Sequence, residues 1–230
     1  MSSKDNSNKK TKRKRKNPFR FFFFDFVKVT GSLSALCWIL PKRLYENKNA
    51  RKPVRKGGVV IANHTGITDP IALYCAYWYR RPHIIAFKEL FEKKIGNWFF
   101  RKMGCIPVDR DNFGMDTYRA AQEVLAENRL LCLFPEGAIN HDKQTIQSFK
   151  SGAALMALKG KAPILPVYIA PRKRWYNRTV MVIGEPIDIV KLYAEKGGLR
   201  GIDEVTQIVH EKEIKLMEIY NAWKTKKSSK

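Results

Sequence analysis

Residues 58–70, GVVIANHTGITDP, carry the strongest structural signal in the chain. Its first six residues form a short apolar run rich in β-branched side chains, which predicts a strand buried on both faces. Pro70 suits the first turn of a helix, where its missing N–H is not needed. The stretch therefore predicts a buried strand that leads, through a turn carrying His64 and Asp69, into a helix.

The same alternation continues along the chain. Further strands are predicted at 83–87, 105–108, 130–134, 164–170 and 179–184, and helices at 70–80, 114–128, 149–160 and 203–224, with an amphipathic, aromatic-rich stretch at 89–103. Strands that alternate with helices are typical of an α/β fold, so we expect a mixed, mostly parallel sheet flanked by helices. Pro166, inside the run ILPV, predicts a bulge or a break in strand pairing.

Composition and charge narrow the class of protein. The chain has 230 residues, of which 44% are hydrophobic, so it can bury a core and is not disordered as a whole. Its formal net charge is +23; residues 1–20 contribute +8 and residues 222–230 contribute +4, which leaves +11 on 21–221. A body this basic favours an anionic partner, and charge alone does not distinguish nucleic acid, a membrane surface and a phosphorylated substrate.

The N-terminal region differs in character from the rest. Residues 1–17 are predicted to be a disordered basic arm. Residues 18–44 hold five of the 13 phenylalanines within positions 21–26, but Asp25 and Lys28 make the segment too polar to predict a spanning helix. We expect it to be a helical segment that associates with the membrane interface, the alternative being a first core helix. A folded domain over 45–225 and a basic tail over 226–230 complete the predicted organisation.

Several kinds of site are absent from the sequence. It contains no GxGxxG, no GxxxxGK[ST] and no GxSxG motif, so the common dinucleotide, phosphate-loop and serine-hydrolase signatures are missing. The four cysteines form no CxxC pair and indicate reduced, packed thiols in a cytosolic setting. No spacing of histidines and cysteines predicts a metal site; His210-Glu211 begins an HExxH pattern, but Ile214 stands where the second histidine is needed.

The five-residue separation of His64 and Asp69 has a chemical meaning. Across a turn that enters a helix, it can bring the carboxylate back to the imidazole. A carboxylate on one ring nitrogen fixes the tautomer and leaves the other nitrogen to take a proton. Because no serine or cysteine in the motif is an obvious nucleophile, the proton would come from a substrate hydroxyl that itself attacks. The alternative is a helix-capping aspartate beside a histidine satisfied within the loop.

Four blocks of sequence, taken together and in order, resemble the glycerolipid acyltransferases, the family that includes 1-acylglycerol-3-phosphate acyltransferases. They are Asn63-His64-Thr65-Gly66-Ile67-Thr68-Asp69, which is similar to NHxxxxD, then GCIPVDR ending in Arg110, FPEG containing Glu136 and Gly137, and ILPV containing Pro166. The resemblance covers roughly residues 55–190. Taken singly, each of the last three blocks also fits an ordinary surface or edge-strand role.

The resemblance implies a role for each matching residue. His64 is the expected general base and Asp69 its orienting partner, with Asn63 as a further substrate-binding residue of the first block. Arg110, Glu136 and Gly137 are expected to help bind the phosphorylated acceptor. Pro166 and its neighbours are expected to shape the acyl-donor side. One departure concerns the third block, which commonly continues Glu-Gly-Thr-Arg; here Ile139 replaces that arginine, and Lys88, Lys143 or Lys150 is expected to supply the charge.

The family transfers an acyl group from acyl-CoA or acyl carrier protein to a glycerolipid hydroxyl, without a bound cofactor. The resemblance therefore implies conversion of 1-acylglycerol 3-phosphate to phosphatidic acid at the cytoplasmic face of the cell membrane, with an anionic membrane surface, a lysophospholipid and an acyl thioester as partners. A different lysolipid or glycerol-phosphate acceptor is the first alternative. A basic nucleic-acid-binding protein is the second, although the chain shows no recognised nucleic-acid-binding motif and no specific nucleic acid is expected. A catalytically silent relative is the third.

Overall fold

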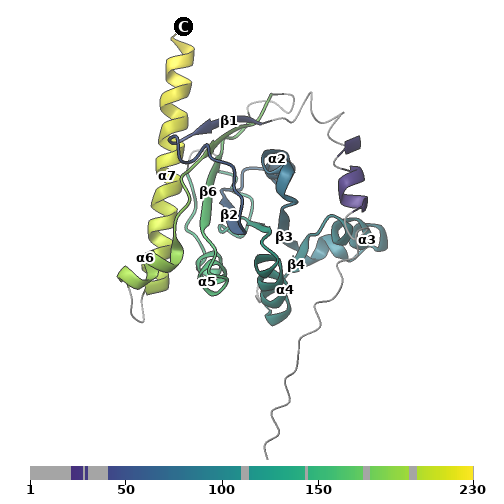
Figure 1. Ribbon diagram of the computed structural model, residues 1–230. Coiled ribbons are helices and arrows are strands. Elements are labelled where there is room, and N and C mark those ends of the chain that lie inside the picture. The colour runs from purple at the N-terminus through teal and green to yellow at the C-terminus, as the bar shows by residue number, and fades with distance from the viewer. Residues whose placement is uncertain are drawn as a thin grey trace, which may run out of the picture.

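A seven-stranded sheet with helices on both faces organises the chain (Figure 1). The computed structural model describes residues 22–27, 29–30, 41–109, 114–142, 145–172, 177–196 and 201–229. The strands are β1 (Lys42–Tyr45), β2 (Gly58–Ala62), β3 (His83–Phe87), β4 (Ile106–Val108), β5 (Leu130–Leu133), β6 (Ile164–Ile169) and β7 (Val180–Ile183). The helices are α2 (Asp69–Ala76), α3 (Lys94–Lys102), α4 (Met115–Ala126), α5 (Gly152–Lys159), α6 (Ile189–Lys196) and α7 (Gly201–Ser228), with short 3₁₀ turns η2 (Trp78–Arg80) and η3 (Lys88–Phe91).

The strands run in the order β1-β7-β6-β2-β5-β3-β4, and every neighbouring pair is parallel except β6 and β7. The predicted α/β class and the mixed, mostly parallel sheet are confirmed. Because β2, β5 and β6 are parallel neighbours, their carboxyl ends meet at one edge. Ligand and catalytic groups collect at this edge in open α/β sheets, and His64 follows β2 there.

The core lies on both faces of the central strands. All five residues of β2 are buried, as the apolar run 58–62 predicts. Val60, Leu165 and Val167 pack on one side with Leu73 and Tyr77 of α2. On the other side, the alternate side chains of the same strands pack against helices α4, α5, α6 and α7, as the layers of Figure 1 also show. A strand that contacts helices on both faces needs apolar side chains at every position, which explains why these runs do not alternate.

Three predicted elements differ from the structure. Pro166 neither breaks nor bulges β6, which pairs with β2 through Ile61 and continues to Ile169. The missing N–H of Pro166 falls opposite Gly184, just past the end of β7, while its carbonyl still accepts the Gly184 N–H at 2.9 Å. The helix predicted at 70–80 ends as an α-helix at Ala76 and continues as the 3₁₀ turn η2, and the helix predicted at 149–160 begins at Gly152.

Two elements were not predicted. Lys42–Tyr45 forms edge strand β1, paired with β7, so the expected domain start at 45 falls inside a strand. Residues 189–196 form α6, and α7 runs to Ser228, past the expected domain end at 225. Both β1 (KRLY) and α6 are short and rich in charge, so their apolar pattern is weak, and pairing with distant segments decides their conformation.

Candidate active site

His64 and Asp69 meet as the sequence predicts. His64 Nδ1 lies 3.0 Å from Asp69 Oδ2, and both side chains are largely buried. The His64 ring also stacks on Phe134, at 4.1 Å between ring centroids and 16° between planes. The stacking and the carboxylate together restrict the rotation of the imidazole, which leaves Nε2 as the nitrogen available for proton transfer.

The aspartate does more than orient the histidine. Its Oδ2 also accepts the backbone N–H groups of Thr65 and Gly66, at 2.6 and 2.8 Å. Asp69 stands in the first turn of α2, followed by Pro70. One carboxylate therefore closes the turn between β2 and α2 and contacts His64 as well. The alternative of a helix cap is not what the structure shows, because the N-cap residue is Thr68, which makes no side-chain capping hydrogen bond, and Asp69 accepts N–H groups of the loop that precedes the helix.

Two residues that were expected to bind substrate, Asn63 and Glu136, are hydrogen-bonded to the backbone around the His64 loop. Glu136 is buried, and its Oε1 accepts the His64 backbone N–H at 3.0 Å while Oε2 accepts the Gln147 N–H at 3.4 Å. Asn63 is buried as well and bridges to β6: its Nδ2 donates to the Ile169 carbonyl and its Oδ1 accepts the Ile169 N–H. Both side chains therefore fix the backbone on which His64 is carried.

A third supporting residue comes from a distant part of the chain. Glu213 of α7 has no exposed surface, and its Oε1 accepts the Asn63 N–H at 2.5 Å. Its Oε2 has no hydrogen-bond partner in the part of the chain that the structure describes. This role of Glu213 was not predicted from the sequence. The signal that could have indicated it is a glutamate on the apolar face of a helix, three residues before the buried Leu216.

Burial perturbs both carboxyl groups behind the loop. Burial raises the pKa of Glu136, although the N–H groups of His64 and Gln147 oppose the shift. Burial also raises the pKa of Glu213 well above its usual range, with the Asn63 N–H opposing the shift and the nearby Glu136 charge adding to it. The protein therefore holds two carboxyl groups with raised proton affinity directly beneath the His64 loop.

Two cations lie beside the motif. Gly137 has a left-handed backbone (φ +77°), and a Cβ placed there would lie 3.0 Å from Lys150 Nζ, so the Lys150 side chain crosses directly over this glycine. No carboxylate among the described residues pairs with Lys150, which is exposed. On the other side, Arg172 Nη2 donates to the Thr68 hydroxyl within the first block. The fold thus brings Lys150, which was predicted, and Arg172 to the loop that holds His64.

The remaining predicted residues lie elsewhere or are not described. Lys88 Nζ is 2.8 Å from Asp109 Oδ2, so its charge is already paired near the end of β4. Arg110 and Lys143 lie outside the described residues. Pro166 is buried within β6, three residues before Ile169, to which Asn63 is hydrogen-bonded. Within the described ranges, no group of three or more His, Cys, Asp and Glu side chains is placed to hold a metal ion.

Part of the predicted membrane segment is described. Residues 22–27 and 29–30 are helical and lie beside α3, where the Phe23 and Trp98 ring centroids are 4.7 Å apart (Figure 1). Asp25 accepts two hydrogen bonds from Arg81, and Phe24 packs near Tyr74, so three consecutive residues attach this helix to the domain. Among the helices that can be described, none combines the length and apolar character that crossing a bilayer requires.

Several known proteins resemble this chain in sequence. A family model described as Acyltransferase matches residues 43–170. The 1-acyl-sn-glycerol-3-phosphate acyltransferase of Bacillus subtilis is 31% identical over 150 residues, which cover 63% of this chain and 73% of that protein. Its counterpart in Streptococcus pneumoniae is 28% identical over 225 residues, covering 95% of this chain and 80% of that protein.

A solved structure shares the fold. The 1-acyl-sn-glycerophosphate (LPA) acyltransferase PlsC from Thermotoga maritima superimposes with a TM-score of 0.62 and 24% identity. The match covers 87% of this chain and 81% of that chain.

Proposed function

This chain belongs to the acyltransferase family, and we propose that it transfers an acyl group from an acyl thioester to the free hydroxyl of 1-acylglycerol 3-phosphate, giving phosphatidic acid. The observation that carries the proposal is the contact of His64 Nδ1 with Asp69 at 3.0 Å, which leaves Nε2 as the base. The acceptor is the one named in the similar proteins of Bacillus subtilis and Streptococcus pneumoniae.

In the proposed reaction His64 Nε2 takes the proton of the acceptor hydroxyl as the oxygen attacks the thioester carbonyl carbon. Asp69 stabilises the imidazolium that forms. The tetrahedral intermediate then collapses, the C–S bond breaks, and the departing thiolate receives the proton from His64. The donor is acyl-CoA or acyl carrier protein, and these steps need no bound cofactor. Base assistance of this kind contributes about 10²–10⁴-fold, so alignment of the two substrates supplies much of the remaining acceleration.

Two cations support a phosphorylated acceptor. Ile139 occupies the place where the third block of similar sequences commonly has an arginine. Lys150 crosses Gly137 of that same block, and Arg172 reaches Thr68 of the first block. An arginine offers a planar pair of donors that matches phosphate, and a lysine adds a point charge. In the proposed complex these two side chains hold the acceptor phosphate in place of the missing arginine.

Association with the membrane is also part of the proposal. The helical residues near the N-terminus and α3 together present exposed apolar side chains, with Phe22 66%, Ile95 82% and Trp98 53% exposed. Helix α3 buries none of its residues, and Lys94, Arg101 and Lys102 belong to it. Aromatic and cationic side chains on one surface favour an anionic bilayer interface, where lysolipid substrates reside. We place this surface at the cytoplasmic face of the cell membrane.

A direct assay tests the reaction. Purified full-length protein is incubated with an acyl thioester and, separately, with 1-acylglycerol 3-phosphate and with lysolipids that lack the phosphate monoester, and the lipid products are identified by mass spectrometry. We expect phosphatidic acid to form fastest. Preferential acylation of a different lysolipid would contradict the proposed acceptor but not the family chemistry, whereas the absence of any acylated product would contradict both.

A further inference from the structure

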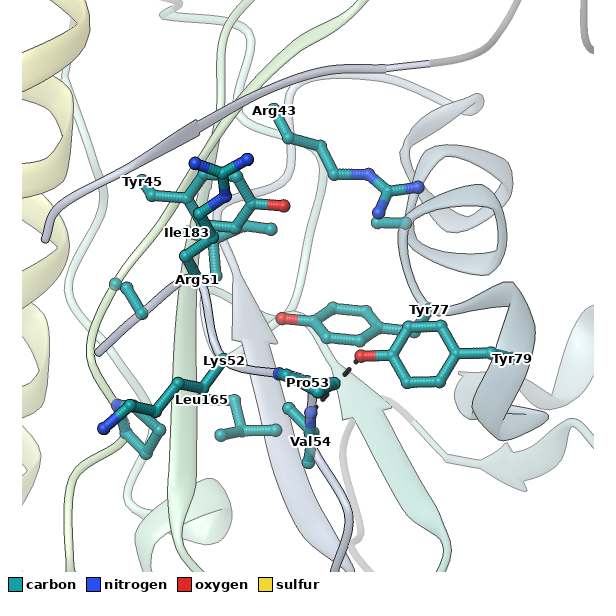
Figure 2. Close-up of a pocket in the computed structure, with 14 residues that line it drawn as sticks. Arg43, Tyr45, Arg51, Lys52, Pro53, Val54, Tyr77, Tyr79, Leu165 and Ile183 are labelled. Atoms are coloured by element: carbon teal, nitrogen blue, oxygen red, sulfur yellow. Dashed lines mark hydrogen bonds between the residues drawn. The ribbon is translucent and has the colours of Figure 1, made fainter. Parts of the chain in front are cut away.

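A cavity of about 150 Å³ lies at the C-terminal end of α2, away from the catalytic loop (Figure 2). Strand β1 and the loop that follows it form one wall, and the last turn of α2 with η2 forms another. Asp69 begins α2 and Ala76 ends it, so the cavity and the catalytic pair are separated by the length of the helix, about 12 Å. Leu165 and Ile183 contribute apolar surface.

The polar side chains that line this cavity are all hydrogen-bond donors. They are three cations and three phenols: Arg43, Arg51, Lys52, Tyr45, Tyr77 and Tyr79. No carboxylate is present among the described residues that line the cavity. The nearest acids along the chain are engaged elsewhere, since Glu46 binds Lys212 Nζ at 2.5 Å and Glu185 accepts hydrogen bonds from Asn47 and Asn49 at 2.8 Å. The excess of donors favours an anionic occupant.

Tyr77 adds a hydroxyl to the wall of the cavity. The residue is 3% exposed, and Figure 2 shows its hydroxyl pointing into the cavity. Among the described residues this hydroxyl has no hydrogen-bond partner, while the neighbouring Tyr79 hydroxyl accepts the Val54 N–H at 3.4 Å. The Tyr77 hydroxyl is not one of the fully buried polar atoms left unpaired within those residues, so solvent in the cavity can reach it. An acceptor atom in the cavity would replace that solvent and receive the hydrogen bond of the hydroxyl.

Arg43 offsets the partial negative charge at the C-terminal end of α2, which would otherwise disfavour an anion in the cavity. The C-terminal end of a helix carries partial negative charge on its free carbonyls. Arg43 Nη2 donates to the Cys75 carbonyl at 3.3 Å, which offsets that charge and fixes the guanidinium beside the cavity. The other N–H groups of Arg43 remain available, and the exposed Arg51 lies at the opposite wall (Figure 2).

We propose that this cavity binds a phosphate group, using Arg43, Arg51 and the Tyr77 hydroxyl. Two guanidinium groups and a set of phenols offer more donors than the two oxygens of a carboxylate can accept, whereas the terminal oxygens of a phosphate monoester match them. The phosphate is either free or the headgroup of a lipid whose chain follows the apolar wall. The inference does not depend on the proposed transfer reaction, because the cavity lies apart from His64.

The test uses the full-length protein and two probes. Inorganic phosphate, compared with chloride at matched ionic strength, is titrated by calorimetry, and binding to phosphatidylcholine vesicles with and without phosphatidate is measured by co-sedimentation. The variants are Arg43→Gln/Arg51→Gln and Tyr77→Phe. The matched control is Arg55→Gln/Lys56→Gln, which removes two exposed charges from the same loop outside the cavity. Melting curves identify any variant that has not folded, and Tyr77→Phe, which keeps the ring, is then decisive.

We expect the double arginine variant to weaken phosphate binding at least about tenfold. Tyr77→Phe should weaken it about threefold, and the control should leave it within about twofold. If the loss appears with inorganic phosphate, the ligand is a free phosphate; if it appears only with phosphatidate vesicles, the ligand is a lipid headgroup. No phosphate binding above chloride in either assay, or an equal loss in the control, would overturn the proposal.

Discussion

The two ends of helix α2 contrast in how their polar groups are satisfied. At the N-terminal end, Asp69 accepts hydrogen bonds from the loop and contacts His64, while Glu136, Asn63 and Glu213 hold the backbone behind it. At the C-terminal end, the Tyr77 hydroxyl and two guanidinium groups face a cavity without an acidic partner. At the N-terminal end of α2 the polar groups are therefore paired within the protein, whereas at the C-terminal end a bound ligand would pair them.

Removing the base should have the largest effect at the N-terminal end. We expect His64→Ala to lower kcat by about 10³–10⁴-fold, because the imidazole is the base that accepts the hydroxyl proton in the proposed reaction. The protein should still fold and bind vesicles, since the backbone contacts of the loop do not use the imidazole. Steady-state kinetics check this, with the exposed His141→Ala as control. Near-normal turnover would remove His64 from the mechanism.

The Asp69→Asn variant separates two roles of Asp69 at the N-terminal end of α2: orienting the His64 imidazole and holding the backbone of the loop. The amide no longer stabilises the imidazolium, and kcat should fall about 10²–10³-fold, with a smaller change in KM. Asp188→Asn is the control, because the Asp188 carboxylate also accepts two backbone N–H groups but lies outside the site. If both variants reduce kcat equally, Asp69 acts only by holding the backbone of the loop.

A cation at the active-site end should affect binding more than chemistry. We expect Lys150→Gln to raise KM for 1-acylglycerol 3-phosphate about tenfold with little change in kcat, since a phosphate contact stabilises the ground and transition states alike. Lys159→Gln, which removes an exposed lysine from the same region of the chain, should leave KM unchanged. A KM that is insensitive to Lys150→Gln would indicate that the phosphate is held elsewhere.

The smallest expected effect concerns stability and its dependence on pH. Because burial raises the pKa of Glu213 in the folded protein, the unfolded chain loses this proton first, so stability should fall as pH rises from about 4.5 towards the raised value. In Glu213→Gln this loss should vanish, and its thermal unfolding temperature should decline less with pH than that of the wild type. The exposed Glu211→Gln serves as control. If the unfolding temperatures of the wild type and Glu213→Gln changed with pH in parallel, ionisation of Glu213 would not affect the stability of the folded protein.

Glu213→Leu complements that measurement. It removes the acceptor of the Asn63 N–H and leaves that group buried and unpaired, which should destabilise the fold by about 1–3 kcal/mol. Glu213→Gln keeps an acceptor and should recover most of this loss. Recovery of kcat together with stability would place Glu213 as a positioning residue for the loop.

The supporting residues were harder to predict than the contact between His64 and Asp69. His64 and Asp69 are five residues apart, so a local turn is enough to bring them together, and the motif carries the signal. Glu213 reaches Asn63 across 150 positions, and Asn63 reaches Ile169 across 106. No short sequence pattern indicates such contacts, because they depend on the order of the strands in the sheet and on the packing of α7 against one face of the sheet.

Sequence patterns were sufficient to predict the α/β class, the strands buried on both faces and the His64–Asp69 contact. These features follow from local periodicity and short loops, which depend on neighbouring residues. Three other features could be seen only in the folded protein: Pro166 lies opposite the end of β7, Lys42–Tyr45 joins the sheet, and hydrogen-bond donors surround the cavity beside Tyr77. Each of these depends on which distant segments become neighbours, and that is set by the free energy of packing the whole sheet and its helices.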